Sequence, residues 1–424
     1  MDSAAEETDQ SPRGYFELLR ENPNFRRLWL GQVVSQLGDW FNTIALYVIA
    51  LKLTGSGQAV SLILVTRFLS TVFSSPLAGV IADRFDRKKV MIAADLGRAV
   101  VVLGFLFIRR PEDAWLIYFL TVLQLVLSTF FEPARAASIP SVVEPKDLLT
   151  ANGITAVTWS AMLTTGAAIG GFATAALGTD AAFVLDSATY LLSAFLFLGL
   201  NLPPRPPREK QKLTVLRATG LEDVFEGLKY VCRRPRVLAV MLAKPAQCIA
   251  GGTLTLLAIY GEKVFPIAGS GEIGIGVLYA MRGVGTAFAP IVVQRFVRGS
   301  RRSLENSLGA AFFFIGTFFA LFGTTENYPL AICLLLAAYA GGSLIWINST
   351  ALMQKYVDDE FRGRVFAAEL CLLTLMLAGS NYAVGVLLDD FNFSLRQVTI
   401  GIGLVATIPG VIWFVTGKFW QTDD

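Results

Sequence analysis

The chain alternates long apolar runs with short polar and charged intervals. A helix needs about 20 apolar residues to cross the hydrocarbon core of a bilayer, and the runs reach this length. They predict twelve transmembrane helices, at residues 28–52, 59–81, 89–108, 114–134, 149–177, 181–200, 237–261, 272–294, 304–323, 328–353, 364–388 and 396–417. The first run is too long for the core of a cleaved signal peptide, so we expect it to remain as a helix.

The basic residues indicate how the predicted helices are oriented. Most of the 36 Lys and Arg residues lie in segments that would face the same side as the N-terminus, whereas the opposite loops carry only Lys52, Arg109, Arg110, Lys263 and Arg396. Positive residues accumulate on the cytoplasmic side of membrane proteins. Both termini are therefore predicted to be cytoplasmic.

The longest polar interval divides the runs into two groups of six. It starts with the Pro-rich residues 201–210, and apolar residues at helical spacing in residues 221–234 predict an amphipathic helix on the cytoplasmic membrane face. Similar loops in the two halves indicate a duplicated transporter. The predicted organisation is a tail (1–27), a six-helix bundle (28–200), a linker (201–236), a second six-helix bundle (237–417) and a C-terminal tail (418–424).

The composition supports a membrane protein and narrows its chemistry. The chain is 54% hydrophobic and 16% charged, whereas soluble domains carry about 25% charged residues. It has four cysteines without CxxC spacing and no histidine, so a proton would have to be carried by a carboxylate or a lysine, and no metal site is expected. The phosphate-binding pattern GxxxxGK[ST] is absent. We therefore predict neither an enzyme nor a cofactor, with the proton gradient as energy source.

The turn between the second and third runs reads GVIADRFDRKK from Gly79 to Lys89. It resembles the loop signature GxLaDrxGrkxxl of the major facilitator superfamily, with Asp86 in place of a glycine. A small residue lets two helices approach closely, and a carboxylate is stabilised at a helix N-terminus. We interpret the turn as a conformational lock rather than only a basic topology anchor, with the residues Gly79, Asp83, Arg84, Arg87, Lys88, Asp95 and Arg98. Asp95 and Arg98 would complete an ionic cluster with Asp83.

A second stretch, GAAIGG from Gly166 to Gly171, resembles the GPxxGG sequence that antiporters of this superfamily carry in their fifth span. Ala167 stands where that pattern has proline. The resemblance implies exchange of cargo against another species through Gly166, Gly170 and Gly171. The alternative is general close packing of helices, which small residues also permit.

The whole chain resembles the drug and siderophore exporter branch of this superfamily, which includes macrolide-efflux and enterobactin-exporter proteins. The stretches that carry the resemblance are residues 22–29, 79–89, 133–140, 186–190 and 362–366. It implies an all-α membrane protein with twelve helices in two pseudo-symmetric six-helix bundles, and a monomer. Many proton-coupled exporters have an arginine near the position of Gln124, which puts their usual proton mechanism in doubt here.

Charged residues inside the runs are the main functional candidates, because they rarely face lipid. The proton-coupling or substrate candidates are Asp39, Arg67, Arg282, Glu369, Lys244 and Asp186. Asp39 is the midpoint of a polar stripe at helical spacing, formed with Gln32, Ser35, Gln36, Asn42 and Thr43. We expect Arg67 or Arg282 to neutralise Asp39. The pair would either serve proton exchange or be a permanent structural contact.

Polar and aromatic residues near the same depth are weaker candidates for lining a cavity: Gln36, Trp40, Asn42, Thr43, Gln124, Gln247, Asn348 and Asn381. The sequence thus predicts a proton-coupled exporter of an amphipathic or hydrophobic small molecule, drug-like or siderophore-like, in the cytoplasmic (inner) membrane of a bacterium. Its predicted partners are the lipid bilayer and the substrate, with no nucleic acid. The alternatives are transport of a divalent metal or a lysophospholipid, and a non-transporting sensor or scaffold.

Overall fold

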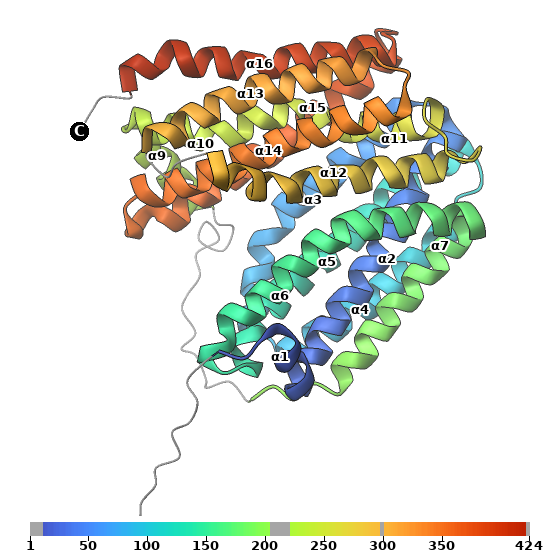
Figure 1. Cartoon of the computed structure of the whole chain (residues 1–424). Coiled ribbons are helices and arrows are strands. Elements are labelled where there is room, and N and C mark those ends of the chain that lie inside the picture. The colour runs from blue at the N-terminus through green and yellow to red at the C-terminus, as the bar shows by residue number, and fades with distance from the viewer. Residues whose placement is uncertain (1–11, 204–220, 297–300, 421–424) are drawn as a thin grey trace, which may run out of the picture.

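The computed structural model of the chain describes residues 12–203, 221–296 and 301–420, and it is almost entirely helical there (Figure 1). For residues 75–80, 82–84, 221, 288–296, 301 and 418–420 only the backbone is described. Three residues of the predicted lock, Gly79, Asp83 and Arg84, fall in these stretches, so their contacts lie outside the described residues. The same holds for most of the predicted linker and for both chain ends.

The described residues of the first half form seven α-helices: α1 (Tyr15–Glu21), α2 (Pro23–Thr54), α3 (Gly57–Arg84), α4 (Arg87–Leu103), α5 (Ala114–Val142), α6 (Leu148–Ala161) and α7 (Ala167–Leu198). A π-turn, Met162–Gly166, joins α6 to α7. Gly178 interrupts α7 with a φ of 84°, a conformation that glycine adopts without steric cost. This break falls between the predicted runs 149–177 and 181–200.

The described residues of the second half form eight further helices: α9 (Leu221–Cys232), α10 (Pro235–Gln247), α11 (Thr253–Lys263), α12 (Gly271–Phe296), α13 (Arg301–Thr324), α14 (Tyr328–Tyr356), α15 (Asp359–Asp389) and α16 (Leu395–Trp420). A short 3-10 turn, Cys248–Gly252, connects α10 to α11. The two helices thereby cover the single predicted run 237–261.

Nine helical segments of the described residues are long and apolar enough to cross a membrane, and one of them, Pro145–Leu198, covers two predicted runs. The α2 helix is outside this set because its stripe of polar side chains lowers its mean hydropathy. The α12 helix, whose side chains are described only up to residue 287, is outside it as well.

Polar side chains determine where several helices begin. Asn22 accepts a hydrogen bond from the backbone N–H of Phe25 at the start of α2, and Ser56 accepts one from Ala59 at the start of α3. Asp86, which replaces a glycine of the family signature, accepts from the backbone N–H of Lys88 at 2.9 Å at the start of α4. Such caps satisfy N–H groups that a helix leaves without an internal partner.

The helices form two bundles. In the first, α2 packs along α7, and α4 packs against α5 and α7; in the second, α13 packs against α14 and α16. The main contacts between the bundles are those of α3 with α15 and of α7 with α12. Figure 1 shows the bundles meeting on the right of the view, near the labels of α7 and α11, and diverging toward α1 and α9.

Polar contacts hold the bundles together at one end of the molecule. Asp389, the last residue of α15, accepts hydrogen bonds at the N-terminus of α3 from the backbone N–H of Gln58 at 2.7 Å and from the Ser56 hydroxyl. Lys52 of α2 forms an ion pair with Glu272 of α12 at 2.7 Å. We call this end, with residues 52–58, 272 and 389, the closed end.

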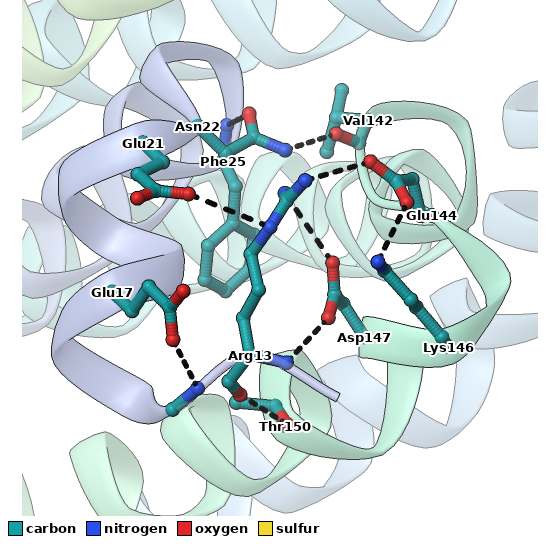
Figure 2. Close-up of polar contacts among 11 residues, drawn as sticks. Arg13, Glu17, Glu21, Asn22, Phe25, Val142, Glu144, Lys146, Asp147 and Thr150 are labelled. Atoms are coloured by element: carbon teal, nitrogen blue, oxygen red, sulfur yellow. Dashed lines mark hydrogen bonds and ion pairs between the residues drawn. The ribbon is translucent and has the colours of Figure 1, made fainter. Parts of the chain in front are cut away.

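The other end of the first bundle carries the N-terminal segment. Arg13 forms ion pairs with Glu144 at 2.8 Å and with the buried Asp147 at 3.4 Å (Figure 2). Thr150 donates a hydrogen bond to the backbone oxygen of Arg13. Leu18 of α1 is fully buried. These contacts fasten α1 to the turn between α5 and α6.

The α9 helix lies where the sequence predicts an amphipathic helix, and one side of it contacts the second bundle. It packs against α15, with Tyr230 donating a hydrogen bond to Asp358 at 3.0 Å and Glu226 paired with Arg364 at 3.0 Å. Val231 is fully buried, whereas Phe225 is exposed. Part of the apolar side of α9 therefore covers protein, while Phe225 remains exposed.

Candidate functional site

The polar stripe of α2 contacts α5 and α7 of the same bundle through a chain of hydrogen bonds. Asn42 donates to Gln124 at 2.7 Å, and Gln124 donates to the hydroxyl of Tyr190 at 3.0 Å. Tyr190 donates in turn to Oδ1 of Asp39 at 2.5 Å. Three of these side chains are buried and Asp39 is half-buried. We call Asp39, Tyr190, Gln124 and Asn42 the Asp39 network.

A glycine makes this contact between α2 and α7 possible. A Cβ atom at Gly38 would overlap the side chains of Thr189 and Asp186 on α7. Small residues let transmembrane helices approach closely, because they leave room for the facing backbone. The absence of a side chain at Gly38 thus brings Tyr190 within hydrogen-bonding distance of the neighbouring Asp39.

Two further carboxylates and an arginine lie beside the Asp39 network. Asp95 and Arg98 of α4 form an ion pair, and both are buried. The Arg98 guanidinium lies 4.3 Å from the ring centroid of Tyr190 and 4.5 Å from that of Phe131. Asp186, one turn before Tyr190, is fully buried, and its Oδ2 has no hydrogen-bond partner among the described residues. The region therefore holds three carboxylates close to one ion-paired arginine.

The predicted pairing of Asp39 with Arg67 or Arg282 is not what the structure shows. Arg67 donates to the hydroxyl of Thr43 at 3.0 Å, and Thr43 donates to the backbone oxygen of Asp39 at 2.6 Å. No ion pair joins either arginine to Asp39 in the described part of the chain. The physical reason is that the carboxylate turns toward α7, where the Tyr190 hydroxyl takes the place expected for a guanidinium.

The second bundle contains a buried ion pair. Nζ of Lys244 on α10 lies 2.8 Å from Oε2 of Glu369 on α15, and the two side chains are 4% and 3% exposed. The ring of Trp346 lies 4.8 Å from the ammonium and that of Phe366 5.6 Å. Lys244 and Glu369 thus neutralise each other. Around Asp39, in contrast, three carboxylates lie near one ion-paired arginine.

The remaining cavity candidates separate into two groups. Trp40 lies at the contact between the bundles, with its ring 6.1 Å from that of Tyr279 on α12, and Gln36 has a buried Oε1 without a hydrogen-bond partner in the described residues. The others lie within the second bundle or at its contact with α3. There Gln247 faces Gly342, Asn348 donates to Ser307 at 2.7 Å, and Asn381 accepts from Thr255 at 3.0 Å.

The antiporter-like glycines lie between α2 and α12. Added Cβ atoms would meet the Trp40 ring at Gly166, the Trp40 backbone oxygen at 2.8 Å at Gly170, and the Cα of Gly276 at 2.9 Å at Gly171. The motif therefore permits close contact both within the first bundle and across to the second.

The described residues of the predicted lock have separate contacts. Arg87 donates to the backbone oxygen of Ala137 on α5, and Lys88 donates to that of Leu198 at 2.8 Å. The Asp95–Arg98 pair, in contrast, lies against Tyr190. Whether it joins Asp83 lies outside the described side chains.

Sequence reasoning missed Tyr190 as a functional residue. In the sequence it stands out only as the last residue of the stretch 186–190, which carries the family resemblance. The signal that could have found it is its position one helical turn after Asp186, which puts a hydroxyl and a carboxylate on the same face. Asp389 was missed because a carboxylate at a loop edge has no distinguishing pattern.

Comparison with known proteins identifies the family. A family model described as Major Facilitator Superfamily matches residues 28–370. The chain belongs to the Major Facilitator Superfamily. It is a multi-pass membrane transporter and not an enzyme, and the resemblance drawn from the loop signature is confirmed.

Three bacterial relatives agree with this. The chain is 25% identical over 404 residues to the uncharacterized MFS-type transporter YfiS of Bacillus subtilis, covering 92% of this chain and 94% of the relative. It is 21% identical to macrolide efflux protein A of Streptococcus pyogenes, covering 83% and 86%. It is 24% identical to the enterobactin exporter EntS of Escherichia coli, covering 82% and 81%.

Solved structures share the fold. A POT family transporter in complex with 5-aminolevulinic acid superimposes with a TM-score of 0.74 at 12% identity, covering 97% of this chain and 99% of that one. The architecture of this transporter is therefore the major facilitator fold. The resemblance to the exporter branch rests on the sequence relatives rather than on this structure.

Proposed function

We propose that this transporter exports an amphipathic or hydrophobic small molecule in exchange for protons, by alternating access between two six-helix bundles. The proposal includes twelve transmembrane helices, two cytoplasmic termini and the cytoplasmic membrane of a bacterium. It also includes action as a monomer in the bilayer, without a cofactor and driven by the proton gradient. Relatives named as a macrolide efflux protein and an enterobactin exporter support the direction of transport.

The Asp39 network is the observation that carries the proposal. Carboxylates at membrane depth often mark proton pathways. Asp39, Asp95 and Asp186 lie near one ion-paired arginine, Arg98, so a proton can be taken up by the group while the Asp95–Arg98 pair stays intact. Of the three carboxylates, only Asp39 is not fully buried, which makes it the one that water reaches first.

The position of Asp39 links its charge to the contact between the bundles. The next residue, Trp40, touches Tyr279 of α12 and faces Gly166 and Gly170 of the antiporter-like stretch. A change in the charge of Asp39 alters its hydrogen bond to Tyr190. It therefore also alters how α2 packs against α7. A group with different contacts in two states can bias the equilibrium between them.

The contacts at the closed end support alternating access. Asp389 and the Lys52–Glu272 pair join the bundles there, and the helices diverge toward the end that carries α1 and α9. With cytoplasmic termini, the closed end faces outward, and the arrangement corresponds to an inward-facing state. Cargo would enter from the cytoplasm and leave after these contacts break.

The proposal is tested with the purified transporter in proteoliposomes under an imposed pH gradient. Erythromycin, enterobactin and tetraphenylphosphonium serve as probes, and Asp39→Asn is compared with wild type and with Asp180→Asn. Asp180 is an exposed carboxylate paired with Arg109. Asp180→Asn therefore makes the same chemical change away from the site. We expect gradient-driven movement of at least one probe by wild type and Asp180→Asn, and a loss of about tenfold or more in Asp39→Asn.

Two results would contradict the proposal in different ways. Gradient-driven movement that survives Asp39→Asn unchanged would remove Asp39 from coupling. No movement of any probe, of a lysophospholipid or of a divalent metal would favour a sensor on a transporter fold.

A further inference from the structure

Arg67 and Arg282 are two charged residues that the Asp39 network does not use. Other basic residues within the long helices have a carboxylate partner, namely Arg98 with Asp95, Arg135 with Glu132 and Lys244 with Glu369. Arg67 donates instead to the neutral hydroxyl of Thr43. Arg282 lies over the ring of Tyr339, 5.7 Å from its centroid. In the described part of the chain, neither guanidinium forms an ion pair.

The two arginines belong to different bundles but flank the same contact. Trp40 of α2 touches Tyr279 of α12 across the bundle contact. Thr43, the partner of Arg67, lies three residues after Trp40, and Arg282 lies three residues after Tyr279. Residues three apart on a helix lie on the same face about one turn away. Arg67 and Arg282 are therefore placed on the two sides of the Trp40–Tyr279 contact.

Their surroundings combine guanidinium groups that form no ion pair in the described residues with aromatic surface. A guanidinium has five N–H donors, and the contacts above give Arg67 one neutral acceptor and Arg282 an aromatic face. A cation held within a membrane without an anion is costly, and such residues usually face a water-filled space or a ligand. Both arginines are half-buried, so both remain accessible.

We propose that Arg67 and Arg282 together bind an anionic group of the cargo, with the half-buried Trp40 and Tyr339 contacting its apolar part. This inference rests on the proposed export function and narrows its substrate class to amphipathic molecules that carry a carboxylate. The planar guanidinium matches a carboxylate through two parallel hydrogen bonds. Because one arginine comes from each bundle, a bound anion also bridges the two halves that must move.

The binding site is connected to the Asp39 network by one residue. Thr43 accepts the hydrogen bond from Arg67 and donates to the backbone oxygen of Asp39. An anion that draws Arg67 away from Thr43 therefore changes a contact on the helical turn that carries Asp39. This gives cargo binding a direct route to the proposed proton site.

The inference is tested by binding to the transporter in lipid nanodiscs. Three probes share one aromatic body: 2-naphthylacetate, its methyl ester, and 2-naphthylmethyl-trimethylammonium. We expect the carboxylate to bind about tenfold or more tightly than the ester and the cation, since hydrogen bonds to charged groups are the strong ones. Arg67→Gln and Arg282→Gln should each remove most of this preference, as measured by isothermal titration calorimetry.

Matched variants control for charge and folding. Arg109→Gln and Arg396→Gln remove exposed arginines that are paired with Asp180 and Glu326, and they should keep the full preference for the carboxylate. Arg67→Lys and Arg282→Lys keep the positive charge but lose the planar guanidinium that binds a carboxylate through two hydrogen bonds. These variants should retain part of the preference for the carboxylate. The ratio of the affinities for carboxylate and ester within each variant reports charge recognition even if the variant is less stable.

The outcomes separate this inference from the export function. Binding of the carboxylate no tighter than the ester, or an unchanged preference in Arg67→Gln and Arg282→Gln, would overturn the inference. Proton-driven movement of the ester or the cation but not of the carboxylate would also overturn it while leaving the export function standing. A carboxylate preference that depends on both arginines, without proton-driven movement of any probe, would support the inference and count against proton coupling.

Discussion

The two bundles bury charge in different ways. In the second bundle, the carboxylate of Glu369 is matched by Lys244 at 2.8 Å, while Arg282 forms no ion pair in the described residues. In the first, Asp39, Asp95 and Asp186 lie near a single ion-paired arginine, and Asp39 is held by a tyrosine hydroxyl. A matched pair is stable as it is, whereas a surplus of carboxylates leaves a group whose charge can change.

The comparison assigns different roles to groups that look alike in the sequence. Asp39, Asp186, Lys244 and Glu369 all interrupt apolar runs, and all four are candidates on that ground. The Lys244–Glu369 pair joins α10 to α15 within one bundle, while Asp39 sits next to the Trp40 contact between the bundles. We therefore interpret the first as a structural pair and the second as the coupling site.

Removing one member of the matched pair should have the largest effect on stability. Lys244→Met leaves Glu369 buried without a cation, and we expect a loss of about 3–5 kcal/mol in the free energy of unfolding. The double variant Lys244→Met with Glu369→Leu should recover most of it, because apolar residues of similar volume fill the same space. Unfolding of the purified transporter in detergent measures the free energy of unfolding of the single and the double variant. A single variant as stable as wild type would contradict a structural pair.

The close contact of α2 with α7 gives the next largest effect. Gly38→Ala would force its Cβ into Thr189 and Asp186, and such overpacking typically costs about 1–3 kcal/mol. Gly379→Ala is the matched control, because Gly379 on α15 has open space around the added atom. It should be neutral or stabilising by up to about 1 kcal/mol, as Ala favours helix over Gly.

The same two glycine variants separate packing from transport when proton-driven movement is measured. Gly38→Ala should lose transport as well as stability, since it displaces Tyr190 from Asp39. Wild-type transport in Gly38→Ala would show that this helix contact is not needed for coupling.

A change at the closed end should have a smaller effect, on the equilibrium between states closed and open at that end. Asp389→Ala removes the acceptor that α15 supplies to the N-terminus of α3, beside the cap Ser56. Losing an acceptor at a helix N-terminus is worth about 0.5–2 kcal/mol, so the equilibrium should move roughly two- to thirtyfold toward a state open at that end. Distances between spin labels at Thr54 and Asn392, in a variant without native cysteines, report this opening. Asp390→Ala, next to it and exposed, should leave the distances unchanged.

Unchanged distances in Asp389→Ala would mean that its hydrogen bonds to α3 do not hold the closed end. An equal change in Asp390→Ala would point to a general effect of charge in this loop.

Much of the helical architecture is predictable because apolar length and polar caps determine it locally. The break at Gly178 follows from a glycine between two apolar runs, and the start of α3 from Ser56. The polar stripe around Asp39 is predictable too, since its spacing depends only on helical geometry. The fold itself was predictable from the resemblance of the turn around Asp86 to the family signature.

The partner of Asp39 could not be predicted in the same way. Charge alone favoured Arg67 or Arg282, and it was the close approach at Gly38 that put Tyr190 there instead. Such a contact depends on how α2 and α7 pack, which no periodicity in either helix reveals. The same holds for Asp389, whose partner helix is more than 300 residues away in the sequence.

Proton movement tests the central claim most directly. Proteoliposomes that enclose the pH indicator pyranine report proton flux when a transported probe is added, for wild type, for Asp39→Asn and for the double variant Lys244→Met with Glu369→Leu. The account predicts probe-dependent proton flux in wild type and in the double variant, and its loss in Asp39→Asn. Flux that persists in Asp39→Asn and disappears in the double variant would contradict it.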